Sequence, residues 1–112
     1  MAVLSFAKTN ADTIFLRNAI LRMIVSRAKA YLTDPADLDR LDTAEAMGAI
    51  SFDRMPSDQR ARLVEAVYQG TQALKQEILE GTVTEEPVRS GIEEKLEDIL
   101  VLLSRFRASP GS

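Results

Sequence analysis

The chain has 112 residues, of which 46% are hydrophobic and 28% charged, and its net charge is −3. This length suits one domain, and the composition is that of a globular protein rather than a disordered one. The sequence contains neither Cys nor His. Disulfides, thiolate metal sites, thiol nucleophiles and histidine-dependent catalysis are therefore excluded.

Charge is distributed unevenly along the chain. Residues 1–33 carry five bases and one acid (+4), residues 34–60 three bases and seven acids (−4), and residues 61–112 six bases and nine acids (−3). No apolar run reaches the roughly 18–20 residues that span a bilayer. Arg17 and Arg22 interrupt the most apolar early stretch, which also argues against a secretion signal. We expect a cytoplasmic protein without membrane association.

The first predicted helix runs from about Ala11 to Leu32, with Thr9 or Asn10 as its cap. Scarce Gly and Pro, and the lack of sustained apolar–polar alternation, favour helices over strands. The apolar residues of this segment fall on two helical faces. One face holds Ile14, Leu21, Ile24, Val25, Ala28, Tyr31 and Leu32, and the other holds Phe15, Leu16, Ala19, Met23 and Ala30. Two apolar faces indicate a helix covered on both sides, either within the chain or partly by a partner.

One or two short helices are expected between residues 34 and 56. Asp34 is a suitable cap and Pro35 a suitable first helical residue, so a helix should run to about Leu41. A second short piece should end at Met47, near Gly48. An apolar connection follows, formed by Ile50, Phe52 and Met55.

The third predicted helix runs from Ser57, as its cap, to Glu80, with Gly81 just past its end. Its apolar stripe has a clear helical period, formed by Leu63, Val64, Val67, Thr71, Leu74 and Ile78. Gly70 lies on this stripe. A glycine inside a helix costs about 1 kcal/mol relative to alanine, so we expect a close helix crossing there.

The last helix begins after Thr84 or at Ser90, where residues 90–93 match a capping box. Its stripe consists of Ile92, Leu96, Ile99, Leu103 and Phe106. Residues 100–102 are also apolar and widen the stripe to nearly the whole circumference. Such a wide band predicts burial against another chain.

These elements predict an all-α fold. We expect an irregular or four-helix-like bundle of three long helices and one or two short ones, forming a homodimer. Residues 1–107 should form the single domain, and residues 108–112 a flexible tail.

Two acidic clusters are the strongest sign of chemistry. Glu77 and Glu80 stand at i, i+3 on the third helix, and the last helix carries Glu94 and Asp98 at i, i+4. Such pairs on facing helices can bind Mg²⁺ through their oxygens. Residues 77–103 resemble the all-α nucleoside triphosphate pyrophosphatases of the MazG type, which carry Glu-x-x-Glu on one helix and Glu-x-x-Asp on the next. The resemblance implies a Mg²⁺ site formed by these four residues, although Lys95 stands where the family has its second-helix Glu.

The arginines do not predict a nucleic-acid surface. Arg17, Arg22 and Arg27 recur every five residues, so successive side chains are turned by about 140° and form no single stripe. We expect these bases to pair with acids of residues 34–45, and we expect no nucleic-acid partner.

The sequence therefore predicts a small non-enzymatic interaction protein without a cofactor. A regulator, a toxin-neutralising immunity protein or an adaptor would bind another protein by shape and charge, with the acidic middle segment as its surface. The alternative is the Mg²⁺-dependent pyrophosphatase. Fold class alone does not decide between them.

Overall fold

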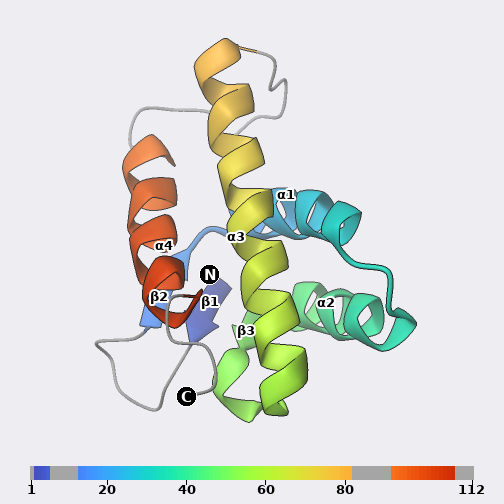
Figure 1. Ribbon diagram of the computed structural model, residues 1–112. Coiled ribbons are helices and arrows are strands. Elements are labelled where there is room, and N and C mark those ends of the chain that lie inside the picture. The colour runs from blue at the N-terminus through green and yellow to red at the C-terminus, as the bar shows by residue number, and fades with distance from the viewer. Residues whose placement is uncertain (1, 6–12, 82–91, 108–112) are drawn as a thin grey trace.

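The computed structural model describes residues 2–5, 13–81 and 92–107. The longest helix, α3, lies at the centre, with α1 and α4 packed against it and α2 beside α1 (Figure 1). In chain order the elements are β1 (Ala2–Ser5), β2 (Thr13–Leu16), α1 (Asn18–Ala28), the 3₁₀ turn η2 (Lys29–Tyr31), α2 (Pro35–Met47), β3 (Ala49–Ser51), the 3₁₀ turn η3 (Phe52–Arg54), α3 (Ser57–Glu80) and α4 (Ile92–Arg107).

The chain is mainly helical, as predicted, but the all-α prediction is wrong because the described residues include a small sheet. Its strand order is β2-β1-β3, with β1 antiparallel to β2 and parallel to β3. The strands have only three or four residues, too few for an alternating pattern to stand out in the sequence. The alternation exists nevertheless: Ala2 and Leu4 are buried, whereas Val3 and Ser5 are half-buried.

The first helix is shorter than predicted. Residues 13–16 form β2, and α1 begins at Asn18, so Phe15 and Leu16 belong to the sheet rather than to a second helical face. The apolar face of α1 remains wide and is covered within the chain by α3 and α2. Its buried residues are Ile20, Leu21, Met23, Ile24, Val25 and Ala28.

The middle segment forms one continuous helix, α2, where one or two short helices were expected. Its start was predicted correctly: the Asp34 carboxylate accepts a hydrogen bond from the Ala36 backbone N–H at 2.9 Å, and Pro35 occupies the first turn. The helix ends at Met47, and Gly48 follows it with a φ of 72°, the left-handed conformation common just past a helix C-terminus. The apolar connection that follows contains β3 and η3, with Ile50 and Phe52 fully buried.

Helix α3 has the predicted bounds, but Pro56 rather than Ser57 precedes it at the cap position and gives no side-chain bond. At Gly70, α3 lies directly against backbone atoms of α1. A Cβ atom added there would lie 2.7 Å from the Ala28 nitrogen and 3.0 Å from the Ile24 oxygen. The predicted close crossing at Gly70 is therefore confirmed, because only a residue without a side chain fits.

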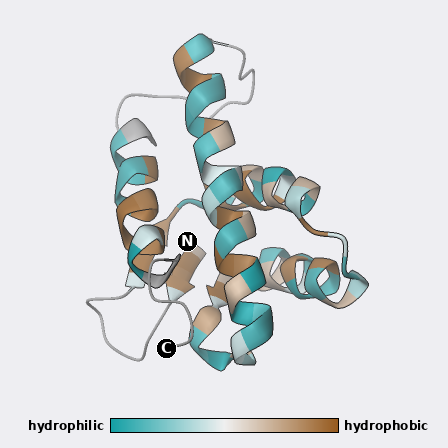
Figure 2. Ribbon diagram, in the orientation of Figure 1, coloured by the Kyte–Doolittle hydropathy of each residue, from teal (hydrophilic) through white to brown (hydrophobic). Residues whose placement is uncertain are grey.

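Helix α4 packs on α3 with part of its apolar band. Leu96, Ile99, Leu102 and Leu103 are buried. Val101, by contrast, is 50% exposed and Leu100 is half-buried, so the middle of α4 keeps apolar surface outside the core. Its hydrophobic middle and the hydrophobic strand β1 stand out in Figure 2.

Three predictions fall outside the described residues. They are the caps at Thr9 or Asn10, the capping box that begins at Ser90, and the tail of residues 108–112.

The crossing predicts that Gly70→Ala lowers the free energy of unfolding. The added methyl meets backbone atoms of α1, which cannot rotate away, so we expect a loss of about 1–3 kcal/mol. Chemical denaturation measures this loss, with Gln72→Gly as a control that reports helix propensity alone at an exposed site of the same helix. A gain of about 1 kcal/mol for Gly70→Ala, the value that helix propensity gives, contradicts the close crossing.

Candidate functional site

The four carboxylates chosen for Mg²⁺ all lie on described helices but do not gather. Glu77 is bound to Arg27, and Glu80 is exposed and accepts a hydrogen bond from Gln76 at 2.9 Å. Glu94 and Asp98 are exposed on α4. Across residues 2–5, 13–81 and 92–107, no three acidic side chains form a group that could hold a metal ion. The geometry thus adds no support to the Mg²⁺ hypothesis.

Glu77 instead joins α3 to α1 through a two-pronged ion pair. The Arg27 Nε and Nη2 atoms donate to its two carboxylate oxygens at 2.7 and 3.0 Å. Arg27 also donates to the Met23 backbone carbonyl at 3.0 Å, which fixes the guanidinium. These hydrogen bonds from Arg27 lower the pKa of Glu77. The pair also offsets the unfavourable position of an acid near the C-terminal end of a helix.

A second ion pair joins α2 to α3 and is buried at its acidic end. The Asp37 side chain is fully buried, and Arg62 donates to both its oxygens at 2.7 and 3.1 Å. Gln59 donates to the same carboxylate at 3.2 Å. The hydrogen bonds from Arg62 are the main cause of the lowered pKa of Asp37. Sequence reasoning missed this pair, although Asp37 falls on the buried face of α2, at helical spacing from Leu41 and Ala44.

Two further pairs tie the helices together: Lys29 with Asp42, and Lys75 with Glu97. Lys29, another early base, thus pairs with an acid of residues 34–45, but the same expectation was wrong for Arg27, which pairs with Glu77 of α3. The acidic middle segment is thus partly used by the fold itself. Among its seven acids, Asp34 caps α2, Asp37 is buried, and Asp42 holds Lys29.

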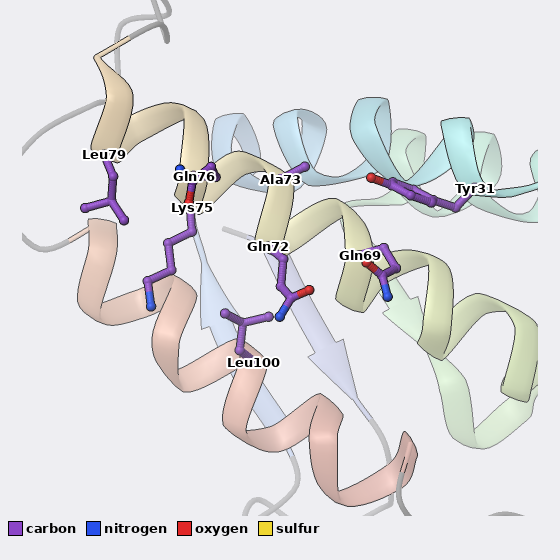
Figure 3. Close-up of a pocket in the computed structure, with 8 residues that line it drawn as sticks. All are labelled: Tyr31, Gln69, Gln72, Ala73, Lys75, Gln76, Leu79 and Leu100. Carbon is purple, nitrogen blue, oxygen red and sulfur yellow. The ribbon is translucent and has the colours of Figure 1, made fainter.

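A depression of about 490 Å³ crosses the solvent-facing side of α3. Its floor is α3, and Leu100 of α4 and Tyr31 of η2 form opposite walls (Figure 3). Tyr31 is 52% exposed and Leu79 59% exposed. The lining residues are Tyr31, Gln69, Gln72, Ala73, Lys75, Gln76, Leu79 and Leu100. Sequence reasoning did not single out this place.

Apart from Lys75, which is paired with Glu97, the floor of the depression is free of charge. Residues 66–74, about two and a half helical turns, include no Asp, Glu, Lys or Arg. Its polar groups are amides: Gln69, Gln72 and Gln76 each donate one hydrogen bond along α3. Each glutamine amide offers two N–H donors and a carbonyl acceptor, so each retains capacity for an incoming molecule. The signal in the sequence was the stretch of residues 66–74, which has no charged residue although it lies inside a long helix.

A smaller hollow of about 270 Å³ lies between the start of α1 and the end of α2. It contains one base, Arg22, and one acid, Glu45, with the 76% exposed Met47 at its side. With one base and one acid, this lining does not indicate a particular class of ligand.

No protein-family model, curated protein or solved structure matches this chain. The resemblance to the MazG-type pyrophosphatases thus rests on residues 77–103 alone. No described helix is both long and apolar enough to cross a bilayer.

The lowered pKa values predict that the free energy of unfolding falls in acid. Because Asp37 and Glu77 have lowered pKa values in the folded chain, the unfolded chain binds protons first as the pH drops. Their contribution is complete above the ordinary carboxyl pKa values and is lost as the pH falls through the lower pKa values of the folded chain. Asp37→Asn should reduce this fall of the unfolding free energy in acid, called here the acid limb. Chemical denaturation at a series of pH values measures it.

Asp39→Asn, at an exposed site on the same helix, is the control and should leave the acid limb unchanged. An acid limb that is as steep in Asp37→Asn as in the original chain contradicts the assignment.

Proposed function

We propose that this protein is a non-enzymatic protein-binding module and that the depression across α3 is its binding surface. It would act as a regulator, an immunity protein or an adaptor, with its partner in the cytoplasm. The observation that supports this most is the depression itself, whose lining on α3 carries three glutamines and a single charged residue, Lys75.

The composition of the depression supports a protein partner. The centres of protein–protein interfaces are depleted in charged residues and rich in aromatic ones, with polar residues around them. Here the glutamines lie along the floor and Tyr31 at one wall, while the single charged residue of the lining, Lys75, is paired with Glu97. Leu79 and Leu100 offer apolar surface that a partner can bury.

The charged residues with perturbed pKa values support a structural role. Groups that act in general acid–base catalysis have pKa values shifted towards neutral pH. Asp37 and Glu77 are shifted the other way, because their arginine partners favour the ionised form. Both pairs join helices, and this fits a scaffold that holds a surface in place.

The acidic middle segment is a less suitable surface than the sequence suggested, because Asp34, Asp37 and Asp42 already serve the fold. The predicted homodimer stays a prediction.

A charge placed in the floor should abolish partner binding. We expect the tagged protein to recover one partner from a nuclease-treated lysate of its native cells, and Gln72→Arg to lose it, because a buried unpaired charge is costly. Thr43→Arg, at an exposed site on α2, makes the matched control and should recover the partner as well as the original chain does. Mass spectrometry with isotope labels compares the recovered amounts.

Equal recovery by Gln72→Arg and the original chain, or recovery of no partner at all, would contradict the proposed function. Circular dichroism and thermal unfolding of each variant confirm that loss of binding does not reflect loss of the fold.

A further inference from the structure

We infer that α2 is a detachable helix, which opens away from α1 and α3 as one unit while α1, α3 and α4 stay folded. Three features support this inference. Helix α2 buries little apolar surface, a charged contact holds it to α3, and the chain is fixed just before and just after it. The inference goes beyond the proposed function, because it concerns a part of the molecule away from the depression.

Helix α2 contributes little to the hydrophobic core. It lies beside α1 (Figure 1), and eight of its thirteen residues are exposed. The apolar side chains that it buries are those of Leu41 and Ala44, whereas α1 buries six apolar residues among eleven. The packing of α2 on α1 is also incomplete, because the hollow of about 270 Å³ lies between them. A helix with few buried apolar contacts opens at a lower free energy than the core helices do.

A charged contact holds α2 to α3. The Asp37 carboxylate is fully buried and accepts hydrogen bonds from Arg62 at 2.7 and 3.1 Å and from Gln59 at 3.2 Å. A buried charge without its partners is costly, so the closed position of α2 depends on this contact. The Arg62 side chain is 47% exposed, so both charges regain water when α2 moves away. The exposed pair of Lys29 and Asp42 adds little to the attachment.

The chain is fixed on both sides of α2, which sets the bounds of the detachable helix. Before it, Leu32 packs against the core, and its backbone N–H donates to the Lys29 carbonyl at 3.3 Å. After it, the Gly48 carbonyl accepts a hydrogen bond from the Val3 N–H at 2.9 Å, and β3 pairs with β1. Residues 33–47 can therefore move as one piece without breaking the sheet or the contact between α1 and α3.

Opening of α2 changes the surface of the molecule. It uncovers the side of α1 on which α2 packs, and it brings the Leu41 side chain into water. A molecule with higher affinity for the opened form shifts the equilibrium towards that form. The contact at Asp37 thus controls whether this second surface is available.

The test is amide hydrogen exchange of the full chain, followed by nuclear magnetic resonance over a series of urea concentrations below the unfolding transition. We expect the amides of Leu41 and Ala44 to exchange at least about tenfold faster than those of Ile24 and Val67, which lie inside α1 and α3. Their exchange should also depend less steeply on urea, because opening one helix exposes less surface than unfolding the whole chain.

Variants separate opening of α2 from unfolding of the whole chain. Asp37→Asn weakens the contact with Arg62 and should speed exchange in α2 at least about fivefold. Asp39→Asn, at an exposed site of the same helix, is the matched control and should change it by less than about twofold. Ile99→Val trims a buried residue of α4 and should speed exchange at Val67 roughly threefold to tenfold while leaving Leu41 unchanged.

Three outcomes would overturn the inference. Equal exchange rates with equal urea dependence in α2 and α3 would show that the two helices unfold together. Fast exchange in α2 that Asp37→Asn does not change would report fluctuation of single turns rather than release of the helix. An equal effect of Ile99→Val on both helices would show that α2 opens only when the whole chain unfolds. None of these outcomes affects the test of the proposed function, which measures recovery of a partner.

Discussion

The backbone contact between α3 and α1 at Gly70 is the constraint on which the arrangement depends. Gly70 has no Cβ atom, so Ala28 and Ile24 of α1 lie directly against α3. This contact turns one side of α3 inward, and α4 covers the adjoining part of that side. The opposite face of α3 is left towards solvent, and that is where the depression lies. Arg27 and Glu77 reinforce the same crossing two turns further along α3.

Most of the paired charges in this protein link elements of the fold, whereas few charges line the depression on α3. Arg27–Glu77, Asp37–Arg62, Lys29–Asp42 and Lys75–Glu97 each link two elements of the fold. Individual exposed pairs contribute little to stability, whereas the buried Asp37 cannot lose its partner without leaving a buried charge. In the depression on the solvent-facing side of α3, by contrast, the lining has a single charged residue, Lys75, and its other polar groups on α3 are glutamine amides. A surface of this kind fits the burial of a partner better than it fits permanent contact with water.

The sequence predicted the long helix α3, its end before Gly81 and the close crossing at Gly70, because periodicity and glycine placement are local signals. It failed at residues 13–16, whose apolar side chains fit a helical face as well as a strand. Residues 13–16 form a strand because they pair with β1. Strand β1 also pairs with β3, which is far away in the sequence, so no local pattern predicts the sheet. The depression was missed for a related reason: its walls, Tyr31 and Leu100, are 69 residues apart in the sequence.

The most direct test of the account is a map of the bound surface in solution. Nuclear magnetic resonance of the ¹⁵N-labelled protein with its captured partner reports the side-chain amide signals of the glutamines separately from the backbone. If the depression is the binding surface, the signals of Gln69, Gln72 and Gln76 shift, together with backbone signals near Leu79 and Leu100. Shifts confined to α2, with these amides unchanged, would show that the acidic segment is the binding surface and would contradict the account.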